Sequence, residues 1–279
     1  MTPLEFVSAA FVLAITAGVL GSLLGLGGGI IVVPALTIVL GVDIRYAIGA
    51  SIVSVIATSS GSALRYVKEE LVNLRLAMFL EIATVSGALS GAYLAGVIPQ
   101  RFLYFVFTAI AVLIGFLMLR QRHEETPPPA ESDAIGRRLG LGGVFKAGGG
   151  APPLAYEVTR TPLGLSMSYL AGAVSGLLGV GGGFLKVPAM NVAMKVPLKV
   201  STATSNFMIG VTAAASAGVF FLRGDVAPCV AAPVATGVIV GALLGSWLIH
   251  HISTRHLRLV FVVVLAWIAV SMALKGLVR

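Results

Sequence analysis

Two glycine-rich stretches carry the residues with the clearest chemistry in this chain. Residues 25–34 read GLGGGIIVVP and residues 179–188 read GVGGGFLKVP, and we call them the glycine frames. Glycine lets a helix unwind and a ligand approach backbone N–H groups, and a helix starting there aims its positive dipole end at that ligand. We therefore expect each frame to contribute to an anion site. The glycines are Gly25, Gly27, Gly28, Gly29, Gly179, Gly181, Gly182 and Gly183.

Soluble phosphate-binding motifs do not fit the frames. A dinucleotide fingerprint needs glycine where Ile30 and Phe184 stand, and a phosphate loop needs a Gly-Lys-Ser/Thr ending, which the frames lack. The alternative is helix packing, because small residues let helices approach closely. Three consecutive glycines exceed what packing requires, so a site is favoured. We assign to packing the G-x-x-x-G spacings Gly21/Gly25, Gly87/Gly91 and Gly237/Gly241/Gly245.

Hydroxyl and amide side chains recur inside two apolar segments and could complete an oxoanion site. Ser51 and Thr58 share a face of a predicted helix over 46–64. The corresponding segment, 201–221, offers Thr204, Ser205 and Asn206. The alternative is that these side chains bond to their own helix or to a neighbouring one.

Two charged residues lie inside apolar segments, where charge is costly and functional by default. Glu81 lies in the predicted span 74–97, and Lys186 directly follows the second run of glycines. Each could bind the substrate, carry a coupling proton or form a structural pair, and Lys186 could instead reach the membrane interface.

The remaining reactive residues give no catalytic or metal-binding pattern. His250, His251 and His256 have no recognised metal spacing, and we expect them at the interface. No Ser/His/Asp order, paired acidic motif or nucleotide site stands out. We therefore predict no enzyme activity, no cofactor and no metal.

The composition places these residues in a membrane protein. Hydrophobic residues make up 57%, charged residues only 11%, and the mean hydropathy is +1.00. A soluble domain carries about 25% charged residues. The net charge of +8 comes mostly from Lys and Arg between apolar segments, as expected of a chain in a lipid bilayer, so no nucleic-acid partner is predicted.

We predict an all-α, polytopic transmembrane bundle of about ten segments. The segments are 4–24, 28–41, 46–64, 74–97, 101–120, 163–180, 182–195, 201–221, 226–249 and 256–276. The second and seventh are short and broken by glycine. Residues 1–120 and 163–279 form two membrane halves, and 121–162, rich in Pro and Gly, is predicted to be a solvated linker.

The two halves are an internal repeat. A shift of 154 residues places the first frame on the second, Ser51 on Ser205 and Thr58 on Thr212. Glu81 and Lys186 have only Ala235 and Val32 as counterparts. The excess of Lys and Arg on the linker side predicts a cytoplasmic linker and termini outside. Ten crossings make the halves inverted, which we prefer; if segments two and seven are re-entrant, the halves are parallel.

The G-x-G-G-G-x-x-x-x-P pattern of both frames, with STATSNFMIGVTAAASAGVFFLRGDV at 201–226, resembles the sulfite exporter TauE/SafE family. The resemblance covers nearly the whole chain except the linker. The first half departs from it, because Ala50 stands where Thr204 does. The resemblance implies a permease of a bacterial or archaeal plasma (inner) membrane that handles anionic sulfur compounds. The motif positions that it marks are the frame glycines, Pro34, Pro188, Thr204 and Ser205.

Together these observations predict a secondary transporter of a small anion such as sulfite, thiosulfate or sulfoacetate, working by alternating access. Glu81 is the candidate coupling residue, with H⁺ or Na⁺ as the coupling ion. The alternatives are a passive anion channel on the same scaffold, or a membrane enzyme or assembly factor. The direction of transport and the oligomeric state stay open.

Overall fold

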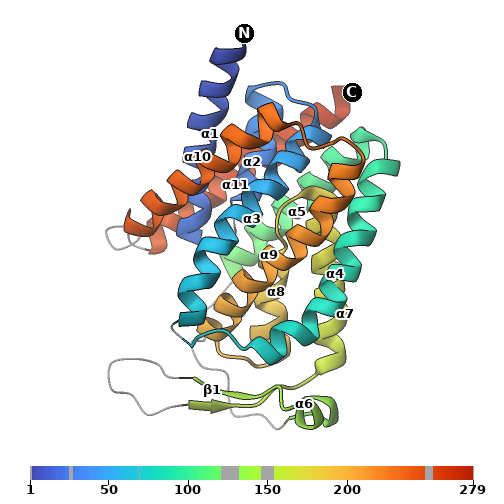
Figure 1. The fold of residues 1–279 in the computed structure, drawn as a ribbon, viewed down its shortest axis with the longest axis vertical. Coiled ribbons are helices and arrows are strands. Elements are labelled where there is room, and N and C mark those ends of the chain that lie inside the picture. The colour runs from blue at the N-terminus through green and yellow to red at the C-terminus, as the bar shows by residue number, and fades with distance from the viewer. Residues whose placement is uncertain are drawn as a thin grey trace.

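Long apolar runs bounded by Gly, Pro or Asn form the helices of a single bundle (Figure 1). The computed structural model describes residues 2–24, 28–68, 70–120, 132–145, 154–248 and 254–278. Six of the described helices, α1, α3, α4, α5, α9 and α10, are long and apolar enough to cross a membrane. The long helices are α1 (Pro3–Leu24), α3 (Ile44–Lys68), α4 (Leu74–Val97), α5 (Gln100–Arg120), α7 (Thr161–Leu178), α9 (Leu198–Leu222), α10 (Pro228–Leu248) and α11 (Thr254–Val278).

Two short broken helices begin at the last glycine of each frame, as the sequence predicts. Helix α2 (Gly29–Pro34) continues as the π-helix η1 (Ala35–Val39), and α8 (Gly183–Pro188) continues as η2 (Ala189–Ala193). Each change of winding comes directly after a proline, which lacks an N–H group and crowds the preceding turn. The wider turn is visible where Met194 N–H donates to the carbonyl of Ala189 at 3.0 Å.

The internal repeat is reproduced element by element. Helices α2, α3, α4 and α5 begin 154 residues before α8, α9, α10 and α11. The halves interlock, because α1 packs on α10 while its counterpart α7 packs on α4. All ten predicted segments are helical to within a few residues of their predicted bounds. That all ten cross the membrane, and that the halves are inverted, stay predictions.

Glycine allows these crossed pairs to touch through their backbones, as predicted for the G-x-x-x-G spacings at Gly87 and Gly237. A Cβ at Gly87 or Gly91 would meet α7 carbonyl oxygens at 2.1 and 2.0 Å. On the other pair, a Cβ at Gly237 or Gly241 would meet α1 carbonyl oxygens at 2.6 and 2.2 Å. Side chains there would force the helices apart.

The segment predicted to be a solvated linker contains secondary structure over its described residues. It forms α6 (Ala134–Leu139) and an antiparallel pair, β1 (Gly143–Phe145) and β2 (Leu154–Tyr156). Leu141, Phe145 and Val158 are buried against Leu76 of α4 and Met194. The sequence prediction rested on the surrounding Pro and Gly and did not take these few apolar residues into account. The start of α1 and the end of α11 lie at the opposite end of the bundle (Figure 1).

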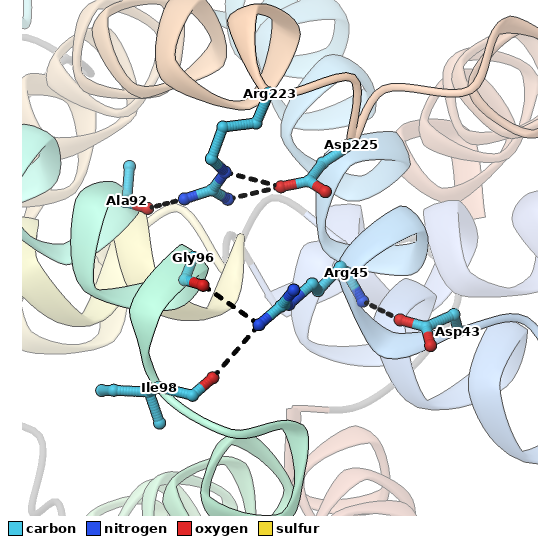
Figure 2. A network of polar contacts seen from close by, with 7 residues as sticks. All are labelled: Asp43, Arg45, Ala92, Gly96, Ile98, Arg223 and Asp225. Carbon is cyan, nitrogen blue, oxygen red and sulfur yellow. Dashed lines mark hydrogen bonds and ion pairs between the residues drawn. The ribbon is translucent and has the colours of Figure 1, made fainter.

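Two arginines hold the C-terminal end of α4, remote from the linker (Figure 2). Arg45 Nη2 donates to the carbonyl of Gly96 at 3.1 Å, and Arg223 Nη1 donates to that of Ala92 at 2.5 Å. Arg223 is in turn bonded through Nε to Asp225 Oδ2 at 2.7 Å. Cations suit the last carbonyl groups of a helix, which have no partner within it. Because α4 carries Glu81, these contacts fix the helix that positions that carboxylate.

The backbone contact between α4 and α7 predicts that Gly172→Ala lowers the Tm of the purified protein. The new Cβ would lie 2.1 Å from the carbonyl oxygen of Thr84. Overpacking of this kind costs about 1–3 kcal/mol. The matched control is Gly218→Ala in α9, where no atom lies within 4 Å and where alanine gains about 1 kcal/mol of helix propensity. Equal Tm values for the two variants would contradict the contact.

Candidate functional site

The two glycine frames meet inside the bundle. A Cβ on Gly29 would lie 2.5 Å from the carbonyl oxygen of Gly179, so the two backbones are nearly in contact. Ser51, fully buried on α3, donates from Oγ to that same carbonyl at 2.7 Å. The serine thereby satisfies a carbonyl group that the end of α7 leaves without a helical partner. One residue of the first half thus stabilises the break in the second half.

The backbone at the frames adopts conformations that favour glycine. Gly28 and Gly182, the residues before α2 and α8, have φ of 74° and 70°. Between α7 and α8, Gly179 and Gly181 are also left-handed, with φ of 69° and 84°. A residue with a side chain is strained in this region. The predicted helix breaks are therefore confirmed at these positions, whereas Gly25 and Gly27 lie outside the described residues.

Ser205 is the polar group best placed to meet a ligand at the second frame. It is 1% exposed, and its Oγ lies 3.5 Å from the position that a Cβ on Gly183 would take. This hydroxyl has no hydrogen-bond partner among the described residues. A buried hydroxyl without a partner costs free energy unless something else satisfies it. Its repeat counterpart, Ser51, is already engaged by Gly179.

Two of the other predicted hydroxyl and amide residues bond to protein groups outside the frames. Thr58 donates to Ser54 and Val55 carbonyls of its own helix, at 3.0 and 3.2 Å, which is the alternative weighed for such residues. Thr204 accepts from the backbone N–H of Asn73 at 3.1 Å, so it contacts the start of α4. Asn206 is buried next to Ser205 on α9. Ligand binding by these three residues stays a prediction.

Glu81 and Lys186 come together around one hydroxyl. Lys186 Nζ donates to Thr212 Oγ1 at 2.7 Å, and Thr212 Oγ1 lies 2.6 Å from Glu81 Oε1. The exposed fractions are 1% for Lys186, 0% for Thr212 and 7% for Glu81. Opposite charges buried this close together stabilise one another, and the hydroxyl links them. We call Glu81, Thr212 and Lys186 the acid–hydroxyl–amine triad.

The triad includes a residue of the second frame, Lys186. Lys186 is three residues beyond Gly183 on α8, and its backbone N–H donates to the carbonyl of Gly182 at 3.2 Å. Thr212 lies two helical turns beyond Ser205 on the same face of α9. A buried ammonium and a free buried hydroxyl therefore follow one another along the α8–α9 contact. Such groups suit an anion.

Thr212 is the member that the sequence analysis did not select. The repeat match to Thr58 does not reveal this role. The two threonines occupy equivalent positions, but Thr58 donates to carbonyls of its own helix and Thr212 links Glu81 and Lys186. Its seven-residue spacing from Ser205 was the available signal. At the positions equivalent to Lys186 and Glu81 stand Val32 and Ala235. The charged pair is thus an addition to one copy of the repeat.

Fold and site together define a polytopic helical membrane protein of the transporter class, with paired broken helices meeting inside the bundle. The profile of the sulfite exporter TauE/SafE family matches residues 10–272. The chain belongs to this family, which is one of membrane transporters and not of enzymes.

Curated relatives agree with this assignment. The chain is 29% identical over 276 residues to "Probable membrane transporter protein YunE" of Bacillus subtilis, covering 95% of this chain and 97% of that protein. It is 26% identical over 272 residues to "Probable membrane transporter protein MJ0441" of Methanocaldococcus jannaschii, covering 92% and 91% of the two chains. No solved structure matches the chain.

The burial of the triad predicts a strong coupling between its charged members. Glu81→Gln or Lys186→Met alone should each destabilise the protein by about 3–5 kcal/mol, because each leaves an uncompensated buried charge. The double variant should recover most of this loss. Thermal or denaturant unfolding of the four proteins in detergent measures the coupling, with Lys199→Met, an exposed lysine of α9, as control. Additive losses would show that the two charges do not interact.

Proposed function

We propose that this protein is a secondary transporter of a small anion, with sulfur oxoanions and organosulfonates as the substrate class. The observation that carries the proposal is the meeting of the two glycine frames, with the unpartnered hydroxyl of Ser205 and the ammonium of Lys186 beside them. Related broken helices that meet within a bundle are the arrangement in which secondary transporters bind substrate.

The sign of the ligand follows from the groups that surround the frames. Helices α2 and α8 begin at the frames, and their first N–H groups carry partial positive charge. Ser205 offers a hydroxyl donor and Lys186 an ammonium. A tetrahedral or pyramidal oxoanion presents several acceptor oxygens to such donors. The family description, sulfite exporter, points to the same class.

The transport cycle that we propose is alternating access, in which the frames face one side of the membrane and then the other. The membrane is the plasma (inner) membrane of a bacterium or archaeon, with the linker in the cytoplasm and the termini outside. The chain is not proposed to act as an enzyme.

A ligand screen on the purified protein tests the substrate class. A ligand present at a hundredfold excess over its Kd stabilises the folded state by about 2.7 kcal/mol. We expect at least one of sulfite, thiosulfate, sulfate, sulfoacetate and taurine to raise the Tm, and tetraethylammonium to leave it unchanged. Stabilisation by the cation and by none of the anions would contradict the proposal.

Flux measurements in proteoliposomes separate a transporter from a channel. A transporter exchanges external radiolabelled thiosulfate for internal unlabelled thiosulfate and accumulates the label against its own gradient. A channel only equilibrates it. Failure of the label to accumulate under every imposed ion gradient, with rapid equilibration, would favour the channel.

The close approach of the frames predicts that Gly29→Ala abolishes this exchange. Its Cβ would lie 2.5 Å from the carbonyl of Gly179 and 2.8 Å from Ser51 Oγ, so the frames must separate. Gly136→Ala is the matched control, because its Cβ would lie 2.7 Å from the carbonyl oxygen of Val158, in the linker. We expect both variants to lose stability and only Gly29→Ala to lose exchange. Equal exchange in the two would mean that the frames serve packing alone.

A further inference from the structure

We propose that Glu81 is the proton-carrying group of this protein and that anion and proton bind together, the anion at Lys186 and the proton at Glu81. This inference rests on the proposed anion transport and adds its coupling ion. The observation behind it is the acid–hydroxyl–amine triad. Among the described residues, Glu81 Oε2 has no hydrogen-bond partner and Lys186 Nζ makes one hydrogen bond.

The acid end can take up a proton. Glu81 Oε1 is bonded to Thr212, while Oε2 is buried and has no hydrogen-bond partner in the described part of the chain. An ionised carboxylate accepts several hydrogen bonds, so a buried oxygen without a donor disfavours the charged form unless a positive charge stands near. Lys186 supplies that charge. Glu81 therefore stays ionised only while the ammonium remains available to it.

The amine end can take up an anion. An ammonium has three N–H donors, and the described residues account for one bond from Lys186 Nζ, to Thr212. Lys186 is 1% exposed, so bulk water does not serve the other two. An anion that reaches the second frame would meet these donors. Its charge would also neutralise the ammonium that holds Glu81 ionised.

The link between the two ends is electrostatic and reciprocal. With Glu81 ionised, the triad is neutral, and an added anion makes the buried site negative. A proton from the aqueous phase that binds to Oε2 lowers this negative charge by one, since COO⁻ and H⁺ become COOH while Lys186 keeps its charge. By linkage, the anion raises the proton affinity of Glu81 as much as the proton raises the affinity for the anion. The two ligands therefore move in the same direction.

Thr212 can follow this change by rotation of its hydroxyl alone. Its Oγ1 lies 2.6 Å from Glu81 Oε1 and 2.8 Å from the carbonyl oxygen of Met208, and its single proton can serve either acceptor. When Glu81 is ionised, Thr212 donates to Oε1. When Oε2 is protonated, Oε1 can still accept from Thr212, or the hydroxyl can turn to the carbonyl oxygen of Met208. The Thr212 proton therefore has an acceptor in either state.

The same contacts argue against Na⁺ as the ion bound here. The described residues offer the oxygens of one carboxylate and the hydroxyls of Thr212 and Thr84, whereas hard cations take about six oxygen ligands. The ammonium of Lys186 lies 2.7 Å from that hydroxyl and repels a second cation. A proton needs only the one free oxygen of Glu81.

No other charge faces Glu81 among the described residues. The elements packed around it carry Arg75 and Tyr93 on α4, Tyr169 on α7 and Lys199 on α9, with Arg223 directly after α9. Arg75 and Lys199 lie near the linker end of their helices, and Arg223 bonds to Ala92 and Asp225 at the other end. Tyr93 is exposed, and Tyr169 bonds to Ser90. Lys186 is the charge that acts on Glu81.

Calorimetric titration with thiosulfate tests the inference. Thiosulfate keeps its charge near neutral pH, whereas sulfite itself takes up a proton. Binding heats measured in two buffers of different ionisation enthalpy give the number of protons taken up with the anion. We expect wild type to approach about one proton per anion as the pH rises above neutral, as the reciprocal coupling requires.

Variants separate this coupling from a purely structural pair. Glu81→Gln should bind thiosulfate and take up no proton, whereas the same substitution at exposed Glu5 should behave as wild type. If Glu81→Gln does not fold, the pH dependence of wild type provides the second test, because uptake should fall as the pH is lowered and Glu81 is protonated before the anion binds. Uptake in Glu81→Gln equal to wild type, or wild-type uptake that does not change with pH, would overturn the inference.

The outcomes for wild type distinguish the two proposals. Thiosulfate binding without proton uptake overturns the coupling and leaves anion transport standing. Failure to bind thiosulfate or any other anion of the screen overturns the proposed function, and the coupling with it.

Discussion

Backbone groups that leave a helix inside an apolar bundle must find partners in the protein, and this requirement organises the structure. In hydrocarbon each unsatisfied group costs several kcal/mol. The breaks before α2 and α8 release such groups at two places, and the fold brings these places together. Ser51 is the clearest example, since this residue of the first half donates a hydrogen bond to the carbonyl of Gly179 in the second half. The frames are buried because neither could exist alone in lipid.

The repeat supplies the scaffold, and the second half adds the charge. Equivalent helices begin at a constant offset, and the crossed packing of α1 on α10 and of α4 on α7 lets each half cover the other. The triad breaks this equivalence, because Val32 and Ala235 stand where Lys186 and Glu81 would. A single charged pair avoids a second desolvation cost in the first half. Among the described residues, one buried Glu–Lys pair therefore stands where a symmetric repeat would have two.

Much of this architecture could be predicted from the sequence, because it depends on local pattern. Hydropathy placed the helices, and the glycine-proline pattern located both breaks. Glu81 and Lys186 stood out because charge is rare in apolar segments. The sequence did not determine which groups the buried polar side chains bond to. Thr58 and Thr212 are equivalent by repeat, yet Thr58 donates to carbonyls of its own helix whereas Thr212 links Glu81 and Lys186.

The linker shows a second limit of prediction from sequence. Its Pro and Gly content indicated solvation, but a few apolar side chains suffice to attach a short segment to an existing bundle. Asn73 gives the attachment its specificity, as it caps α4 through its Oδ1 and donates from Nδ2 to Leu141 and Tyr156. Local composition carries no information about a surface that forms only when distant helices assemble.

For the proposed alternating-access cycle, these contacts restrict which helices can move relative to one another. Helix α4 is held at one end by Asn73 and at the other by Arg45 and Arg223, and its glycines lie against the backbone of α7. Sliding of α4 along α7 would drive carbonyl groups into Cα atoms, so the two helices move as one body. The glycines between α7 and α8 have no such restriction on their dihedral angles. A change in access would therefore displace α8, and Lys186 with it, relative to Glu81. The distance between these two charges is the quantity through which substrate, proton and conformation would influence one another.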